Sequence, residues 1–509
     1  MPLTITPLPV PVPSSTDPGN FSARGDATFG AFPTLITETN ALASEQATNR
    51  DIVIQNRIDT ETAQANAANF ALAASVSEAN SLASSTAQLW VSGTTYSIGT
   101  VVYSPITAST YRRKITGAGT TDPSADSTNW YPVVLDASTN WPAILPSLNL
   151  DFANSGKLDP RITFTRASTA TYFDKLGVLR TAADNEPRFD YDPVTLEAKG
   201  LLIEESRQNL VRWNRDLINV AWVKTGCSVL KNQVGLDGTI EACTIGATAD
   251  NATILQTISS ASAARITSAY LKRLSGVGTI QMTQNNGATW TDITSSVGSN
   301  WSRVEIPSAT IANPIIGFRI VSNSDSIAVD FVQHELGAFS TSPIATTSTA
   351  VTRQADQASM TGTNFSSWYR QDEGTLYEEG STLKRNTDPD PKFTSSITDG
   401  LSNFIMGIRY TIAVSPRVDY AGVTQASIIT LNPYQNDAFH KNAIAVKQND
   451  FAASTNGLAA VVDSSGSLPM TMNTLSIGTY GTVYLCGHIK KIAYYPKRLT
   501  NQELQAITS

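Results

Sequence analysis

The sequence predicts a mainly β protein that carries an extended arm and a long helix near its N-terminal end. Short alternating apolar and polar runs recur beyond residue 148 between turns rich in Gly, Asn, Asp and Pro, as expected for antiparallel strands. Only 16% of the residues are charged while 41% are hydrophobic, a composition typical of turn-rich β surfaces that owe their solubility to hydroxyl and amide groups. A Pro-rich start and an Ala- and Asn-rich stretch precede these strands.

Residues 1–31 are predicted to form a Pro-rich, extended arm, and residues 32–89 a helix. Pro33 suits a first helical turn, and neither Gly nor Pro follows it before Gly93. No other predicted helix is long enough to cover this one, so we expect it to associate with other copies as a coiled coil. A single helix lying along a host surface is the alternative. The seven-residue repeat consists of Leu35, Leu42, Asn49, Asn56, Ala63 and Phe70.

Residues 90–133 form a small segment with an unusual share of aromatic residues. Its pattern resembles carbohydrate-binding modules of the chitin-binding type, in which sugar stacks on an exposed aromatic pair. This sequence has Lys114 and Ile115 where that pair would fall, so we expect the rings to form the core instead. The residues that carry the resemblance are Trp90, Tyr96, Gly99, Val101, Tyr103, Tyr111, Pro123 and Trp130.

Two β-sandwiches are predicted in the rest of the chain. A linker at 134–146 precedes the first sandwich at 147–345, and a second linker at 346–356 precedes the second sandwich at 357–509. Each is expected to consist of strands of about 5 to 8 residues. The segment "TNQELQAI" is expected to end the second sandwich as a short helix.

Several long segments resemble structural proteins of tailed bacteriophages. They include "ITFTRAS", "PRFDYDP", "GLLIEESRQNLVRWNRD" and "TAVTRQAD", and the family implies a jelly-roll-like β-sandwich that is often taken to bind carbohydrate. The arm "DPGNFSARGDATFGAFPTLITETNALA" looks like the virion-attachment segment of phage tail fibres. The last 150 or so residues, with "GHIKKIAYYPKRLTNQELQAIT", resemble laminin-G and concanavalin-A-like lectin sandwiches.

The resemblance to phage tail fibres and receptor-binding proteins implies a location and partners. The chain would be made in the host cytoplasm and assembled into the virion, where residues 1–31 attach to a tail or baseplate protein. It would form a homotrimer and bind host surface polysaccharide. A dimer, and a head or decoration fibre with a purely structural role, stay open as alternatives.

Several functional classes are not indicated. The net charge of −7 and the lack of a basic stripe argue against nucleic acid, and no run of about twenty apolar residues predicts membrane insertion. Neither a metal site nor a cofactor is expected, because the three histidines lie far apart and no nucleotide-binding fingerprint is present. The cysteines, an odd set without CxxC spacing, are expected to be free thiols; they are Cys227, Cys243 and Cys486.

We expect this protein to bind glycan without cleaving it. A glycosidase needs two carboxylates on one surface, and the ExDxE run of lectin-like hydrolases is missing. Glu204 and Glu205 are adjacent, which places them on opposite faces of a strand. A glycan-degrading tailspike enzyme is the alternative function.

Aromatic and amide residues in turns of the second sandwich are the candidate carbohydrate-binding residues, because sugars offer a flat apolar face and hydroxyl groups. One loop, "NPYQNDAFHKN", holds four of them, and a second turn holds an aromatic pair. The candidates are Asn436, Asp437, Phe439 and His440 in the loop, and Trp368 and Tyr369 in the turn.

Overall fold

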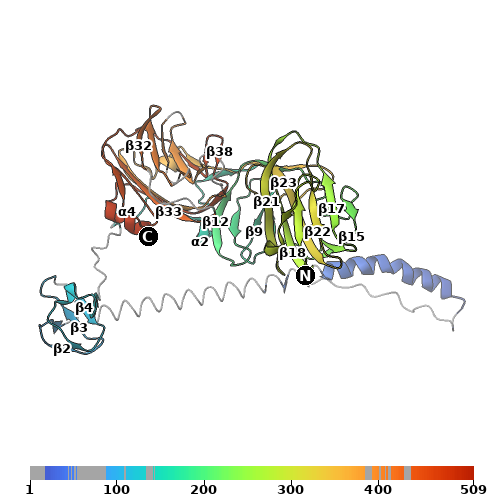
Figure 1. Cartoon of the computed structure of the whole chain (residues 1–509), viewed down its shortest axis with the longest axis horizontal. Coiled ribbons are helices and arrows are strands. Elements are labelled where there is room, and N and C mark those ends of the chain that lie inside the picture. The colour runs from blue at the N-terminus through green and yellow to red at the C-terminus, as the bar shows by residue number, and fades with distance from the viewer. Residues whose placement is uncertain are drawn as a thin grey trace. The chain divides into compact units, whose positions relative to one another are not determined.

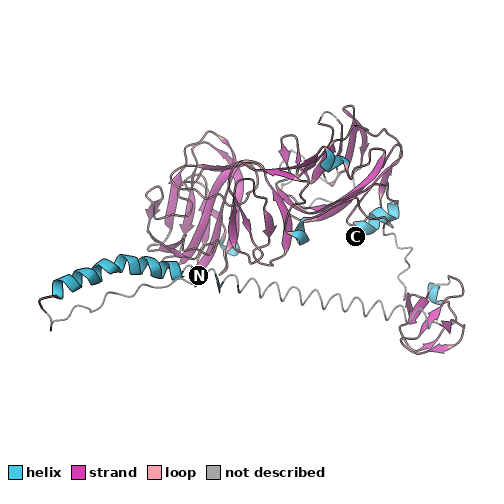
Figure 2. Ribbon diagram, turned by 180° about the vertical axis from the view of Figure 1, so that it is seen from behind, coloured by secondary structure: helices cyan, strands magenta, loops and turns pink. Residues whose placement is uncertain are grey.

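The computed structural model describes residues 16, 18–43, 45–46, 49–50, 53, 88–107, 110–132, 142, 144–383, 392–400, 403–406, 409–410, 414–428 and 437–509. The chain divides into two compact units, Met1–Ala137 and Ser138–Ser509. Most of the described elements are antiparallel strands in several sheets, and the second unit holds two β-sandwiches (Figure 1, Figure 2). The mainly β fold class expected from the sequence is therefore confirmed.

A helix is described at residues 21–43 of the first unit. It begins before residue 32, the start expected from the sequence. Asn20 is its N-cap, a position that favours Asn, and the Asn20 carbonyl accepts a hydrogen bond from the Arg24 amide at 3.0 Å. Pro33 therefore lies inside the helix, and the Thr37 hydroxyl donates to its carbonyl at 2.9 Å. Asn56, Ala63 and Phe70 of the seven-residue repeat, and residues 1–15 of the expected arm, lie outside the described residues.

The small module has an aromatic core. Trp90, Tyr96 and Trp130 are buried against one another, and the Tyr96 and Trp130 rings meet edge to face with centroids 5.3 Å apart. The core role expected for Trp90 and Trp130 is confirmed, whereas Tyr103 is 38% exposed. The strands are β1 (Gln88–Leu89), β3 (Val101–Tyr103), β4 (Thr110–Arg113) and β6 (Trp130–Pro132) in one sheet, and β2 (Thr95–Tyr96) and β5 (Gly117–Ala118) in a ribbon.

One sandwich of the second unit, called the split sandwich, has strands at residues 148–203 and 357–495. Its two large sheets share one core, in which Leu150, Leu201 and Ile444 are buried. The eight-stranded sheet comprises β11 (Phe189–Tyr191), β12 (Ala198–Ile203), β39 (Gly487–Tyr495), β26 (Glu373–Gly380), β33 (His440–Lys447), β34 (Phe451–Thr455) and β35 (Val461–Asp463) in order, with β7 (Leu148–Asp151) also paired to β39.

The second large sheet of the split sandwich has seven strands. In order they are β32 (Val423–Ser427), β31 (Arg417–Tyr420), β29 (Phe404–Met406), β28 (Ser395–Thr398), β36 (Thr474–Ile477), β25 (Gln357–Thr361) and β8 (Thr163–Thr165). Short ribbons and helices complete it: β9 (Ala170–Phe173) with β10 (Leu179–Ala182), β27 (Lys392–Phe393) with β30 (Arg409–Tyr410), β37 (Thr479–Tyr480) with β38 (Val483–Tyr484), α2 (Phe152–Ser155) and α3 (Thr363–Ser366).

The helix expected from "TNQELQAI" is α4 (Asn501–Ile507), so this prediction is confirmed. Thr500 and Glu503 form a capping box, in which the Thr500 hydroxyl accepts from the Glu503 amide at 3.2 Å and the Glu503 carboxylate accepts from the Thr500 amide at 2.6 Å. Leu504 of α4 packs against Tyr377 and other residues of the eight-stranded sheet. None of the helices in the described ranges has the length and apolar character needed to cross a membrane.

The other sandwich, called the inserted sandwich, has its strands at residues 223–336. Its core includes Trp222, Ile245 and Phe318. The chain crosses repeatedly between the two sheets, as in jelly-roll sandwiches. One sheet has the order β14 (Val223–Thr225), β17 (Ala252–Thr257), β22 (Ile315–Ile320), β19 (Ile280–Thr283), β20 (Thr291–Asp292), and the other β15 (Cys227–Gln233), β16 (Ala242–Ala247), β23 (Ser326–Leu336), β18 (Ala263–Ser275), β21 (Ser302–Ile311).

The expected division into sandwiches at 147–345 and 357–509 differs from the division in the structure. Strands β7 and β12 pair with β39 and strand β8 pairs with β25, so the start of the first predicted sandwich belongs with the second. Periodicity indicates where a strand lies and which face it buries, but not which distant strand is its partner. The inserted sandwich separates these partners widely along the sequence.

The chain enters and leaves the inserted sandwich through two paired strands. Strand β13 (Arg207–Asn209) leads in, β24 (Val351–Arg353) leads out, and the two run antiparallel. Part of the segment 346–356, which was expected to be a linker, is therefore a strand. This pairing brings the two ends of the insertion together.

A group of fully buried charged side chains, called the buried arginine cluster, surrounds this entry and exit. Arg188 pairs with Glu204 at 2.7 Å and also with Asp356. Arg353 pairs with Glu204 at 2.8 Å, and Arg166 pairs with Asp356 at 3.0 Å. These residues come from the segments that carry the resemblance to phage proteins, so those segments have a clear structural role here.

Hydrogen bonds from Ser342 add to the ion pairs of the cluster. Glu204 accepts from the amide and the hydroxyl of Ser342, both at 2.7 Å. Burial alone would raise the pKa of the Glu204 carboxyl, but the Arg353 and Arg188 guanidinium groups and the Ser342 hydrogen bonds hold that pKa well below its usual range. Loss of one partner would leave the others as uncompensated buried charges, which is strongly destabilising.

Replacement of Glu204 by Gln is expected to lower the free energy of unfolding by about 3 to 5 kcal/mol, because Arg188 and Arg353 would lose a shared carboxylate. Urea denaturation measures this change. The matched control is Glu241→Gln, which breaks an exposed pair with Lys231 and should cost about 1 kcal/mol or less. Equal losses in the two variants would contradict a stabilising role for the cluster.

His334 on β23 is a buried titratable group of the inserted sandwich. Its Nδ1 lies 2.8 Å from the Thr267 hydroxyl. Burial, with a smaller contribution from the Arg265 charge, lowers the pKa of His334 from 6.5 to about 4. Between these two pH values the unfolded chain binds a proton that the folded chain does not, so stability decreases as the pH falls through this range.

Replacement of His334 by Gln is expected to remove part of the acid sensitivity of the protein. Wild type should lose up to about 3 kcal/mol more than the variant between pH 6.5 and pH 4, because the imidazole must remain neutral when folded. Thermal unfolding midpoints measured across this range give the comparison. Parallel pH profiles for the two proteins would contradict the assignment.

Candidate functional site

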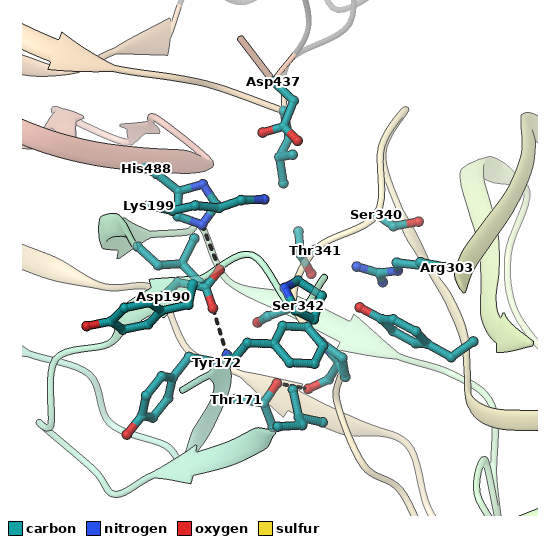
Figure 3. A pocket seen from close by; sticks show the side chains of 18 of the residues that line it. Thr171, Tyr172, Asp190, Lys199, Arg303, Ser340, Thr341, Ser342, Asp437 and His488 are labelled. Carbon is teal, nitrogen blue, oxygen red and sulfur yellow. Dashed lines mark hydrogen bonds and ion pairs between the residues drawn. The ribbon is translucent and has the colours of Figure 1, made fainter. Parts of the chain in front are cut away.

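A cavity of about 540 Å³ opens between the split sandwich and the inserted sandwich. Side chains from the β9–β10 hairpin and from β11, β12 and β39 line it together with side chains from β18 and β21 (Figure 3). The segment 339–343 also contributes. Residues far apart in the sequence meet here because the insertion places one sandwich beside the other.

Aromatic side chains form part of the lining. Tyr172, Phe173, Tyr270 and Trp301 are among the lining residues, and the Phe173 and Tyr270 rings meet edge to face with centroids 6.3 Å apart. The Lys272 ammonium lies 4.9 Å from the centroid of the Trp301 ring. Phe173 and Tyr270 are themselves buried, whereas the partly buried Trp301 offers an apolar ring on which the hydrophobic face of a sugar can stack.

Asp190 and His488 join β11 to β39 at the cavity. The Asp190 carboxylate lies 2.8 Å from the His488 Nε2 and accepts from the Phe173 amide at 2.7 Å (Figure 3). One carboxylate therefore fixes both an imidazole ring and the backbone of the β9–β10 hairpin. This arrangement holds the polar part of the lining in place before any ligand arrives.

Two cationic side chains, Lys199 on β12 and Arg303 on β21, also line the cavity. Figure 3 shows their charged ends directed toward the space between them. The Arg303 guanidinium donates to the Ser268 hydroxyl at 3.2 Å and lies 5.5 Å from the centroid of the Tyr270 ring. Lys199 approaches Asp192 at 3.5 Å.

Three lining residues carry a buried polar atom that has no hydrogen-bond partner among the described residues. These atoms are the Nε of Arg303, the Oγ of Ser340 and the Nδ1 of His488. Buried polar groups are normally hydrogen-bonded, since an unpaired one costs about 1 to 3 kcal/mol.

Of the residues proposed from the loop "NPYQNDAFHKN", Asp437 lines this cavity and is exposed. Phe439 lies beneath the Lys490 ammonium, 4.1 Å from the ring centroid, and His440 is only 3% exposed. Burial lowers the pKa of His440, so its ring is neutral and enclosed. Asn436 lies outside the described residues.

Trp368 and Tyr369 were proposed as a sugar-stacking pair, but the structure places them in the core of the split sandwich. Trp368 is 4% exposed and its indole donates to the Asn364 carbonyl at 2.9 Å. Both rings pack against Phe365 and Tyr494. The Trp368 ring therefore has no free face for a ligand, whereas Tyr369 is partly buried and packs against the same core.

Most residues that line the cavity were not predicted from the sequence to belong to a site. Tyr172, Trp301 and Arg303 lie in the short strands "ATYFD" and "WSRVEI", which gave no sign of a shared site. One available signal was the position of Trp301 directly after the turn "GSN", since a large ring beside a turn is often partly exposed. Their convergence depends on the pairing of distant strands.

The remaining chemistry of the described residues is limited. No group of three or more His, Cys, Asp or Glu side chains in the described part of the chain is placed to hold a metal ion. The three cysteines are free thiols, as expected. Burial raises the pKa of each, so none is activated as a thiolate.

No protein-family model matches the chain, and no curated protein matches it. Solved structures with partial similarity include a native heptameric SAP-like pentraxin from Limulus polyphemus, with 10% identity, a TM-score of 0.23, and coverage of 27% of this chain and 70% of that one. Domain 4 of an extracellular arabinanase from Geobacillus stearothermophilus, solved with arabinotriose, has 9% identity, a TM-score of 0.26, and coverage of 34% and 81%.

A variant of human galectin-16 is a further structural neighbour, with 10% identity, a TM-score of 0.18, and coverage of 25% of this chain and 89% of that one. Similarities this weak and this partial do not decide what the chain binds. The function is therefore argued from the residues of the chain itself.

Proposed function

We propose that this protein is a tail fibre of a tailed bacteriophage and that it binds host surface polysaccharide through the cavity between its two sandwiches. The observation that carries the proposal is the lining of that cavity, where aromatic residues lie beside the charged ends of Lys199 and Arg303. Sugars need both kinds of surface, a flat apolar face and hydrogen-bonding groups. The sequence resemblance to phage fibre modules supports the biological setting.

Binding by each cavity need not be tight. In a homotrimer held together by the N-terminal helix, later contacts form at an effective concentration in the millimolar range, and avidity rises by about 10² to 10⁴. Residues 1–31 would attach this assembly to a tail or baseplate protein of the virion. The fibre would then hold the particle on its host by binding glycan, without cleaving it and without a metal or cofactor.

Replacement of Trp301 by Ala is expected to weaken binding to the polysaccharide of a susceptible host by about tenfold or more, because a central aromatic contact would be lost. Surface plasmon resonance with immobilised polysaccharide measures the affinity. Trp290→Ala is the matched control, since Trp290 belongs to the same sandwich but does not line the cavity. The proposal would be refuted if both variants bound like wild type.

Replacement of Leu35 and Leu42 by Ser is expected to convert a trimer into monomers, because both residues belong to the seven-residue repeat of the helix. Sedimentation equilibrium gives the mass of the particle. The matched control replaces Thr34 and Asn40, two exposed residues outside the repeat, by Ser. A monomeric mass for the wild-type protein would contradict the prediction that the helix associates with other copies.

A further inference from the structure

Arg303 is a partly buried cation of the cavity for which no carboxylate partner is found among the described residues. Its Nε is buried without a hydrogen bond, and its guanidinium contacts the Ser268 hydroxyl and the face of the Tyr270 ring. The arginines of the buried arginine cluster differ in their charge partners. Arg188 and Arg353 each pair with a carboxylate, as buried charges normally require.

The acidic residues that line the cavity are engaged elsewhere. Asp190 is held by His488 and by the Phe173 amide, and Glu204 belongs to the buried arginine cluster. Glu305 also lines the cavity, two residues from Arg303 on β21, and takes part in an interaction. The Arg303 guanidinium thus faces the cavity with its charge uncompensated by Asp190 and Glu204.

A second cation strengthens this pattern. Lys199 also points into the cavity (Figure 3), and its contact with Asp192 is a partly exposed pair at 3.5 Å, which is a weak interaction. Asp437 is the remaining acidic residue among those described in the lining, and it is exposed. The enclosed part of the cavity therefore favours an anionic group.

We infer that the cavity takes a saccharide that carries a carboxylate, as in uronic or nonulosonic acids, and that this carboxylate pairs with Arg303 while Lys199 lies across from it. The inference rests on the proposed function and names the class of glycan. A planar guanidinium suits a carboxylate because two parallel N–H groups can donate to its two oxygens. Trp301 would receive the apolar face of the sugar ring.

A glycan array tests this inference on the full-length protein. The array holds acidic and neutral bacterial polysaccharides, with each acidic polysaccharide printed beside its carboxyl-reduced form. We expect binding to an acidic polysaccharide that weakens by about 10- to 100-fold when the carboxyl groups are reduced, since a hydrogen-bonded ion pair is lost. Equal binding to the reduced form, or selective binding to neutral polysaccharides, would overturn the inference and leave the proposed function standing.

Absence of binding to every polysaccharide on the array would instead count against the inference and the proposed function together. Free glucuronate in solution serves as a competitor that separates recognition of the acidic sugar from recognition of the polymer. Competition by glucuronate but not by glucose is the expected result. Equal competition by the two sugars would contradict a requirement for the carboxylate.

Variants at Arg303 provide a second measurement. Arg303→Gln should weaken binding to the acidic polysaccharide by about 10- to 100-fold and abolish the difference between the acidic and reduced forms. Arg303→Lys keeps the charge but not the paired N–H groups, so its affinity for the acidic polysaccharide should lie between those of wild type and Arg303→Gln. Arg212→Gln is the matched control, because Arg212 is exposed and lies outside the lining. Unchanged selectivity in a folded Arg303→Gln protein would overturn the inference.

Discussion

The larger part of this molecule depends on the pairing of buried arginines with buried carboxylates. Arg166, Arg188 and Arg353 are enclosed almost completely, and Glu204 and Asp356 are enclosed with them. Guanidinium groups remain charged under all ordinary conditions, so burying three of them together requires carboxylates to offset their mutual repulsion. The loops and strands that carry these residues must therefore pack together at one place. That place is the entry and exit of the inserted sandwich.

The geometry of the cavity follows from this constraint. Glu204 belongs both to the buried arginine cluster and to the cavity lining, and its partner Ser342 lies in the segment that continues the lining. Rearranging these buried charged groups would cost a large amount of free energy, so they fix one part of the cavity wall. The inserted sandwich adds Tyr270, Trp301 and Arg303. A preorganised wall of this kind reduces the conformational entropy that a ligand must overcome on binding.

Local features of this fold were predictable from the sequence, and long-range features were not. Strand positions followed from alternation, and helix α4 followed from its capping residues, because both depend on near neighbours. The pairing of β7 and β12 with β39 depends on contacts across the whole insertion, which no local pattern encodes. The same limit explains the site. Asp437 was proposed because it lies in a polar loop, and it lines the cavity. Trp368 was proposed as an exposed ring, but an aromatic residue beside a turn can face inward as well as outward.

The two ends of the inserted sandwich lie side by side, since β13 pairs with β24. An element that enters and leaves at one point can be exchanged as a cassette during evolution without interrupting the strands of its host domain. Such an exchange would keep the wall that bears Lys199 and His488 while it replaces the wall that bears Arg303. Recombination among related genes would thereby produce new combinations of half-sites, and a change of ligand would not require a new fold.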